Sequence, residues 1–441
     1  MNRFTAVLCM AALIASGFAV AYGQDAAQKK NVAAGVNLTV SGEADIDYVY
    51  RDSVAQEVAT WSGGADVDSD TFFSAKVTVR IEADLPDKAK FVLELENKRI
   101  DGGNMDAGAD TLGVNYEQAY LQLSEIYSDK LSVKLGVQDV RYELRDNGQA
   151  MFLDITEAES SFGAANDLST TDRDTLEPVG FSFHYKEGVV NVDFFGMTVA
   201  EVGPNSADES IVGAYFRWML DTLGPNSHVD AVAAINSGSG KNMEVWTLGG
   251  GVNLMDIGSP GLDLFGEVYF QFGDAGRAGT EDLDAGGLAY ELGGRYSFSK
   301  MEMKPWVELS YWFVSGDNDD DDDQDDRFIG YEDVDQFLIV EDNDYGIDVD
   351  TNYTGIKFSG GLSPRDDIDL SAGLGFFKFD EDARLGNEDD LGTELDVKIV
   401  YTYNANVKFD LTVASLFGAD AVKNMTAEEV ASRYGISRPD Q

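Results

Sequence analysis

Apolar and polar residues alternate most clearly in the segment 36–50, VNLTVSGEADIDYVY. Its even positions, from Val36 to Tyr50, are mostly apolar, and its odd positions carry polar and acidic residues such as Glu43 and Asp45. Side chains of a strand alternate between faces, so the segment predicts a strand with one apolar and one acidic face. It is longer than the usual five or six residues of a soluble strand and long enough to cross a bilayer at a tilt.

The same alternation recurs to the C-terminus, and the connections between stretches are long and short in turn. Outer-membrane barrels have this rhythm, with long external loops and short periplasmic turns such as Leu85-Pro86-Asp87. We therefore predict an all-β chain, a single antiparallel transmembrane β-barrel of about 16–18 strands with long acidic external loops. Besides 36–50, strands are predicted near residues 73–82, 91–98, 119–123, 131–137, 181–185, 190–194, 212–218, 229–235, 246–252, 262–270, 288–296, 303–313, 356–358, 368–376, 395–401 and 407–413.

Two segments do not fit the alternation. Bacterial single-chain barrels have an even number of strands, and the stretches number about 17, so one strand is missing or one is false. Residues 142–178 and 328–340 are the candidates for a hidden strand. The first of them is also interpreted as a long loop folded inward as a constriction. A soluble β-sandwich is the alternative fold, and it would require shorter strands.

The two ends of the chain differ from the barrel region, residues 36–418. Residues 1–21 predict a signal peptide, with a short positive start, an apolar run and the small-residue site Ala19-Val20-Ala21. It holds Cys9, the chain's single cysteine, so we expect no thiol chemistry in the mature chain. Residues 22–35 are interpreted as a polar lead-in. Residues 419–441 are interpreted as a C-terminal tail with a short helix.

The charge balance excludes nucleic acid as a partner. The 32 Lys and Arg residues face 80 Asp and Glu residues, a formal net charge of −48. The run at 318–326 and the acids near 342–350 offer oxygen ligands for loosely bound Ca²⁺. The alternative is a solvated loop that repels itself. The candidate metal ligands are Asp319, Asp321, Asp323, Asp342 and Asp344.

If the apolar face contacts lipid, the opposite face lines the interior of the barrel. Charges that face each other across a hairpin should pair there, so Lys76 and Arg80 are expected to meet Glu94 and Glu96. Because both signs occur, we expect a weakly selective or cation-tolerant passage. The predicted pore-lining residues are Lys76, Arg80, Lys90, Lys98, Lys134, Arg217, Arg295, Glu94, Glu96, Glu267, Glu291, Glu308, Glu394 and Asp396.

The sequence offers little for an enzyme. It has two histidines, His184 and His228, which are far apart, and no motif of a nucleophile, a phosphate loop or a metal site. Aromatic residues on the lipid-facing parity, such as Trp218, Trp246 and Tyr311, are typical of an interface girdle. Trp306 and Trp312 have the inward parity and are candidates to stack on a sugar.

Several short motifs resemble the alginate-export type of outer-membrane barrel. The most similar are Thr247-Leu248-Gly249 with Glu267–Gly273, Tyr311–Asp317 and Leu391–Asp396. The segment 135–138 resembles that family's Leu-Gly-Arg-Gln strand but has Val137 in place of the arginine. The resemblance spans most of residues 36–418 and implies a barrel of about eighteen strands that passes solutes. Some members export anionic polysaccharide, and members usually end in an aromatic-terminated strand.

Together these patterns predict an outer-membrane channel for passive passage of small hydrophilic solutes, with saccharides among the candidates. Its expected partners are outer-membrane lipids and those solutes, and a homo-oligomer is left open. The alternative is a structural or surface barrel whose acidic loops bind divalent cations or a partner, without transport. An esterase-type barrel is a third option.

Overall fold

The computed structural model describes residues 28–33, 36–52, 69–100, 115–145, 150, 152, 154–155, 178–200, 209–238, 243–278, 281–317, 323–328, 330, 337–340, 351–381 and 389–418. Within these ranges the regular structure is β-strand throughout. No helix in the described part of the chain has the length and apolar character needed to cross a membrane. The prediction of an all-β chain is confirmed.

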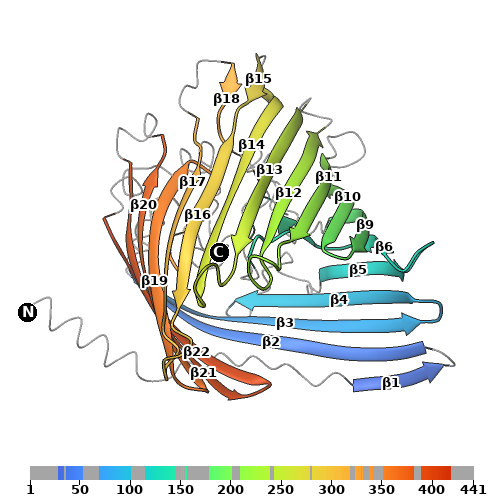
Figure 1. The fold of residues 1–441 in the computed structure, drawn as a ribbon, viewed down its shortest axis with the longest axis horizontal. Helices are drawn as coiled ribbons and strands as arrows, with labels where there is room; N and C mark the ends of the chain where they lie inside the picture. The colour runs from blue at the N-terminus through green and yellow to red at the C-terminus, as the bar shows by residue number, and fades with distance from the viewer. Residues whose placement is uncertain are drawn as a thin grey trace, which may run out of the picture.

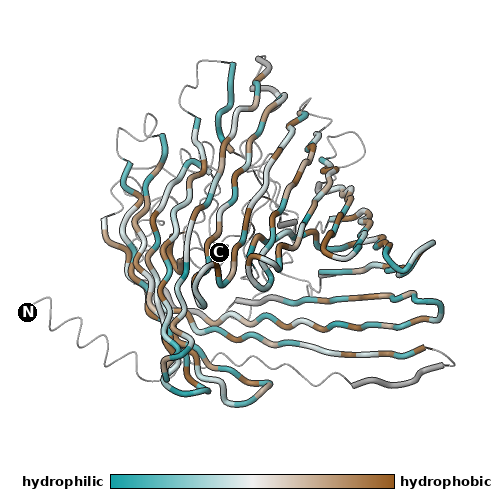
Figure 2. Tube along the Cα trace, viewed as in Figure 1, coloured by the Kyte–Doolittle hydropathy of each residue, from teal (hydrophilic) through white to brown (hydrophobic). Residues whose placement is uncertain are grey.

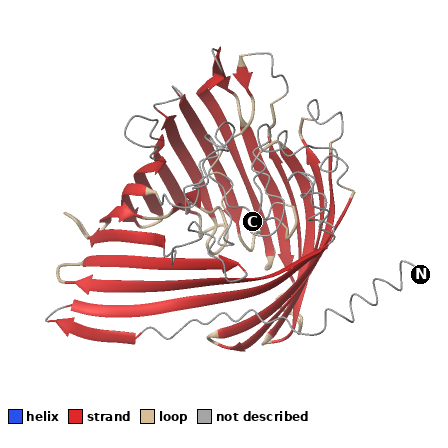
Figure 3. Cartoon of the chain, turned by 180° about the vertical axis from the view of Figure 1, so that it is seen from behind, coloured by secondary structure: helices blue, strands red, loops and turns tan. Residues whose placement is uncertain are grey.

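One 20-stranded sheet contains nearly all of the described strands. Its long strands each pair antiparallel with the next along the chain and form a curved wall (Figures 1 and 3). All 17 stretches predicted from the alternation are present among them. The wall strands are β2 (Val36–Asp52), β3 (Ser69–Leu85), β4 (Ala89–Ile100), β5 (Asn115–Ser124), β6 (Leu131–Val137), β9 (Val179–Glu187), β10 (Val190–Ala200), β11 (Glu209–Met219), β12 (His228–Gly238), β13 (Met243–Leu254), β14 (Leu262–Ala278), β16 (Leu288–Ser297), β17 (Trp306–Val314), β19 (Tyr353–Arg365), β20 (Ile368–Phe379), β21 (Asp390–Asn404) and β22 (Val407–Phe417).

The remaining strands are short. Strand β1 (Gln28–Ala33) lies within the predicted polar lead-in and pairs antiparallel with the start of β2. Strands β15 (Glu281–Ala285) and β18 (Gln324–Asp325) pair in parallel at the long-loop end. A separate two-stranded sheet joins β7 (Val140–Arg141) and β8 (Asp154–Ile155). Neither 142–178 nor 328–340 adds a long wall strand in its described residues.

The two ends of the large sheet come close together. Strands β2 and β22 both run from the short-turn end toward the long-loop end, and among the described residues no ladder joins them. The carboxylate of Asp410 on β22 nevertheless acts electrostatically on Asp45 on β2. The sheet therefore curves so that its first and last long strands approach each other.

Burial in this sheet is the inverse of that in a soluble protein. Apolar side chains on the outer face are exposed, for example Phe73 at 56% and Phe358 at 52%, whereas inner polar side chains such as Thr247 are buried. Hydropathy accordingly alternates along each strand (Figure 2). A soluble sheet would place such an apolar face against a core. The observed pattern is typical of a barrel wall that contacts hydrocarbon.

Candidate channel interior

The inner face of β3 and β4 carries a network of ion pairs. Lys76 pairs with Glu96 at 2.9 Å, and Arg80 contacts both Glu94 (2.5 Å) and Glu82 (2.9 Å). Register explains the second pair, because Arg80 and Glu94 are directly opposite across the turn after Leu85. The predicted pairing of Lys76 and Arg80 with Glu94 and Glu96 is confirmed.

The other predicted basic residues of this region have different neighbours. Lys90 pairs with Glu82 at 3.0 Å. The ammonium of Lys134 on β6 lies 5.0 Å from the centre of the Tyr120 ring, within the range of a cation–π contact. Lys98 occupies a position on β4 that is opposite Lys76 in register. These strands thus hold both signs of charge on one face.

On the far side of the sheet the predicted charges lie deeper. Arg217 on β11 forms a two-pronged contact with Asp230 on β12, at 2.9 and 2.8 Å. Glu267 on β14 is buried and accepts a hydrogen bond of 2.5 Å from the hydroxyl of Tyr269. Glu291 on β16 is half-buried and lies opposite Glu267 in register.

The carboxylate of Glu308 on β17 contacts two arginine side chains. Arg295 on β16 lies 3.8 Å from its carboxylate. Arg145 binds it with both terminal nitrogens, at 3.2 and 2.8 Å. Arg145 comes from the segment after β6, so this contact crosses from that segment to a distant wall strand.

That segment, which we call the first inward segment, comprises the described residues between 138 and 155. The backbone carbonyl of Leu144 faces the side chains of His228 (2.9 Å) and Asn253 (3.4 Å) on β12 and β13. The Tyr142 ring stacks on Tyr215 of β11 with 4.0 Å between centres. Residues 142–145 of this segment, which the structure describes, therefore lie against the inner wall and form no wall strand.

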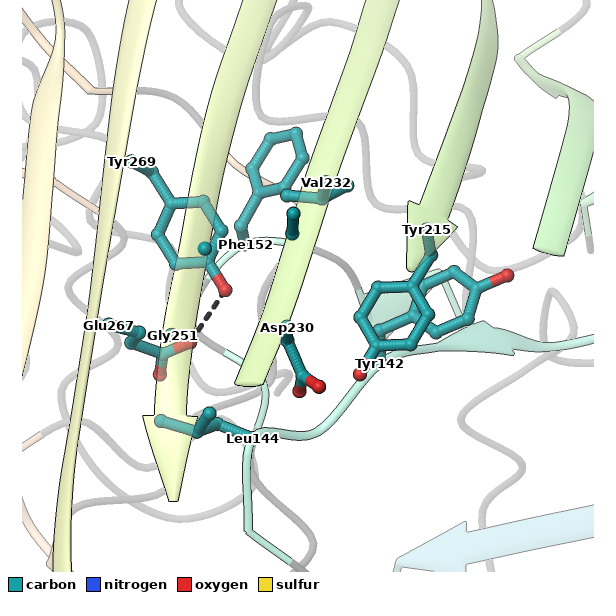
Figure 4. A pocket seen from close by; sticks show the side chains of 11 residues that line it. Tyr142, Leu144, Phe152, Tyr215, Asp230, Val232, Gly251, Glu267 and Tyr269 are labelled. Atoms are coloured by element: carbon teal, nitrogen blue, oxygen red, sulfur yellow. Dashed lines mark hydrogen bonds between the residues drawn. The ribbon is translucent and has the colours of Figure 1, made fainter. Parts of the chain in front are cut away.

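A small cavity marks the junction between the first inward segment and the wall. In Figure 4 the rings of Tyr142 and Tyr215 lie face to face beside Asp230, and Tyr269 points its hydroxyl at Glu267. Gly251 on β13 gives the segment room, because a Cβ there would lie 2.7 Å from Leu144 Cδ1. The first inward segment thus packs against β11–β14 around this cavity, and we call this contact region its seat.

A second inward segment, the described residues between 323 and 340, lies against other strands. Three successive backbone N–H groups donate to two wall carboxylates. Leu338 donates to Asp396 (3.0 Å), and Ile339 and Val340 donate to the two oxygens of Glu394 (2.8 Å each). Glu394 has no exposed surface. Both acids have the predicted inward orientation, and in this structure they hold the second inward segment against β21.

The two inward segments meet through aromatic rings. Phe152 of the first lies 6.1 Å from Phe328 of the second, and both pack near Tyr269 on β14. Phe337 adds an edge-on contact with Phe377 of β20 at 5.3 Å. The buried apolar cluster of the molecule therefore lies inside the curved sheet, formed jointly by the segments and the inner wall.

The interpretation of Trp312 as a residue that stacks on a sugar is wrong. Trp312 is fully buried against Tyr353 and Phe377. The Trp306 ring is covered by the guanidinium of Arg295, which is 4.0 Å from its centre. Their inward orientation was predicted correctly, but the sequence pattern gave no sign of what covers them.

The candidate metal ligands are mostly outside the described residues. This applies to Asp319, Asp321, Asp342 and Asp344. Asp323 is described and exposed, and its backbone carbonyl accepts the N–H of Asp284 at 2.8 Å. In the described part of the chain, no three His, Cys, Asp or Glu side chains gather as a metal site would require.

Sequence patterns did not find Arg145, Tyr142 or the backbone of residues 338–340. The available signal was negative, namely the loss of alternation in both segments. The loss of alternation indicates that a segment is not a wall strand, but it does not predict which wall residues the segment contacts. His228 was singled out only as a rare residue, and its place beneath Leu144 depends on the fold.

Comparisons with known proteins find similarity in structure only. No family model matches the chain, and no curated protein matches it. An anion-selective porin from Comamonas acidovorans is 13% identical, with a TM-score of 0.44, over 87% of this chain and 100% of that chain. A substituted porin from Rh. blastica is 14% identical, with a TM-score of 0.41, over 85% and 100%. Both of these solved structures are porins.

Proposed function

We propose that this protein is an outer-membrane channel of porin type that lets small hydrophilic solutes pass by diffusion. The observation that carries the proposal is the inverted burial of its sheet. Exposed apolar side chains on the outer face would be costly in water, at about 25 cal/mol per Å², and are stable against lipid.

The interior supports passage rather than catalysis. Its charged side chains are engaged in ion pairs along β3 and β4, at positions such as Arg80 and Lys76. Paired charges keep a passage hydrated without binding a solute tightly, which diffusion requires. The first inward segment would set the width of the passage, because it reaches from β6 to Glu308 on β17.

Planar-bilayer recording tests the proposal directly. Purified mature protein should insert and give steady open-channel conductance, and a salt gradient should give a small reversal potential because both signs line the wall. Protein denatured by heat before addition is the control. Absence of channel events from correctly folded protein, judged by its β-sheet circular dichroism, would contradict the proposal.

The competing proposal is a closed surface barrel, and the meeting of the two inward segments at Phe152 and Phe328 favours it. Liposome swelling separates the two and addresses the solute. For a channel, liposomes should swell in sugars up to a size limit, with the rate falling as the sugar grows. A closed barrel leaves the liposomes tight to every sugar.

A further inference from the structure

We propose that solutes cross this molecule off-centre, along the inner face of β2, β3, β4 and β22, which we call the open half of the wall. The inference rests on the proposed function and names the side chains that a solute meets. It follows from an uneven distribution of burial around the inner face.

The opposite part of the wall, β11–β20, is the covered half. Its inner-face side chains are buried even where they are small and polar. Ser310 on β17 is 3% exposed, and Ser359 on β19 is 8% exposed. The ring of Phe337 lies within 3.0 Å of an ideal Cβ at Gly373 on β20. The second inward segment thus packs directly on β20, and the small polar residues of β17 and β19 are shielded from solvent.

On the open half, Ser74 on β3 and Glu96 on β4 are buried, but charged side chains on the same inner face are exposed. Glu43 on β2 and Lys408 on β22 are exposed on the inner face. The Lys76 side chain on β3 keeps 43% of its surface exposed while paired with Glu96. Lys398, at the turn-end half of β21, is 47% exposed beside Asp410 of β22. Water therefore reaches these side chains, and a hydrophilic solute that follows water would reach them too.

Hydrogen bonds also hold the two inward segments against the covered half. Arg145 holds Glu308 through two hydrogen bonds, and Glu394 holds two backbone N–H groups of the second inward segment. Opening a path there would break these buried contacts together with the packing of Phe152 on Phe328. No such rearrangement is needed along the open half.

The geometry assigns solute selection to the charged side chains of the open half. In two of its ion pairs, Lys76 with Glu96 and Lys398 with Asp410, the basic side chain is more exposed than its acidic partner. Glu43 contributes an exposed negative charge from the adjacent strand. A solute would therefore meet charges of both signs along this side of its path.

Single-cysteine variants test the path. Cys9 is the chain's one cysteine, so each variant is made with Cys9→Ser. Ser41→Cys and Glu43→Cys place a thiol on the inner face of β2. Ser310→Cys and Ser359→Cys place it on the covered half, and the three serine changes are matched in size. A charged, membrane-impermeant methanethiosulfonate is added during planar-bilayer recording, and the rate of modification is measured separately by mass spectrometry of protein in liposomes.

We expect a stepwise loss of conductance in Ser41→Cys and Glu43→Cys and none in Ser310→Cys or Ser359→Cys. Modification of the first pair should be roughly tenfold faster, because thiol reaction follows exposure. Block or equal labelling at Ser310 and Ser359 in a conducting protein would overturn the path and leave the proposed function intact. Wild-type protein that conducts nothing would overturn both.

Discussion

The open and covered halves of the wall share one outer face and differ completely inside. Both present alternating apolar side chains outward, as Phe73 on β3 and Phe358 on β19 illustrate. Inside, β3 carries long charged side chains at Lys76 and Arg80. On β19 the corresponding positions hold Gly355 and Ser359, and an ideal Cβ at Gly355 would lie 2.2 Å from the ring of Trp312.

The difference teaches that a barrel wall specifies its two faces independently. The outer face has one requirement, contact with hydrocarbon, and it is met along the whole sheet. The inner face has a local requirement that depends on what lies against it. Small residues such as Gly355 and Ser359 occur where loops and aromatic rings pack, and the charged residues there are buried, as Glu267 and Glu394 are, whereas on β3 the charged side chain of Lys76 stays in contact with water.

Removal of the Arg145 side chain should have the largest effect on the stability of the covered half and on conductance. Arg145→Ala removes the two hydrogen bonds of the mostly buried Glu308 and leaves Arg295 at 3.8 Å. Loss of one partner of a buried pair costs about 4 kcal/mol. We expect unfolding in detergent at lower urea concentration, and larger, noisier conductance because the first inward segment is released.

An exposed pair provides the matched control for that variant. Arg365 at the end of β19 forms an ion pair with Asp367 in the following turn, and its side chain is 66% exposed to solvent. Arg365→Ala should change the free energy of unfolding by at most about 0.5 kcal/mol and leave conductance unchanged. Equal effects of the two variants would show that Arg145 does not fasten the segment.

Glu394→Ala should have the next largest effect, confined to the second inward segment. It leaves the N–H groups of Ile339 and Val340 without their acceptor. Two buried donors without partners cost about 3 kcal/mol. Hydrogen exchange at residues 338–340 should become faster, while Asp389→Ala, at an exposed pair with Lys378, should leave it unchanged. Unaltered exchange in Glu394→Ala would contradict the anchoring role.

The wall was predictable from sequence because its information is local. Alternation predicted all 17 long strands, and the tight turn after Leu85 fixed the register that places Arg80 opposite Glu94. The contents of the interior were not predictable. Arg145 and Glu308 are 163 residues apart in the sequence. Because the segment around Arg145 has no periodicity, its sequence does not predict which wall strands it contacts. Parity placed Glu394 and Trp312 inward, but burial by a distant loop has no local pattern.

Gly251→Val should have a smaller effect, on the seat of the first inward segment. The new side chain would push Leu144, whose Cδ1 is 2.7 Å from the position of a Cβ. Overpacking of this kind costs about 2 kcal/mol. We expect a lower urea midpoint and faster proteolysis of the first inward segment. Ala233 points outward from β12, so Ala233→Val should leave the urea midpoint almost unchanged. Equal decreases of the urea midpoint in both variants would contradict the packing of Leu144 on Gly251.

Substitution of Asp139 should have the smallest effect, a change in the pH dependence of the folding stability. It begins the first inward segment and faces Glu94, Gln118, Lys134 and Arg80, and burial together with the charge of Glu94 raises its pKa to about 6. Its ionisation therefore opposes folding, so stability declines as pH rises from about 4 to 6 and is constant above that range. Asp139→Asn should be more stable than wild type at pH 8, with the advantage vanishing near pH 4.

The same titration should be visible in conduction if solutes pass beside this residue. In wild type, the ratio of cation to anion permeability should fall as pH drops through 6, because a negative charge next to the open half is lost. Asp139→Asn should lack this step and keep the lower ratio at every pH. A step of unchanged size in the variant would place the titrating group elsewhere. Absence of a step in wild type, with the stability difference present, would place the passage away from Arg80 and Glu94.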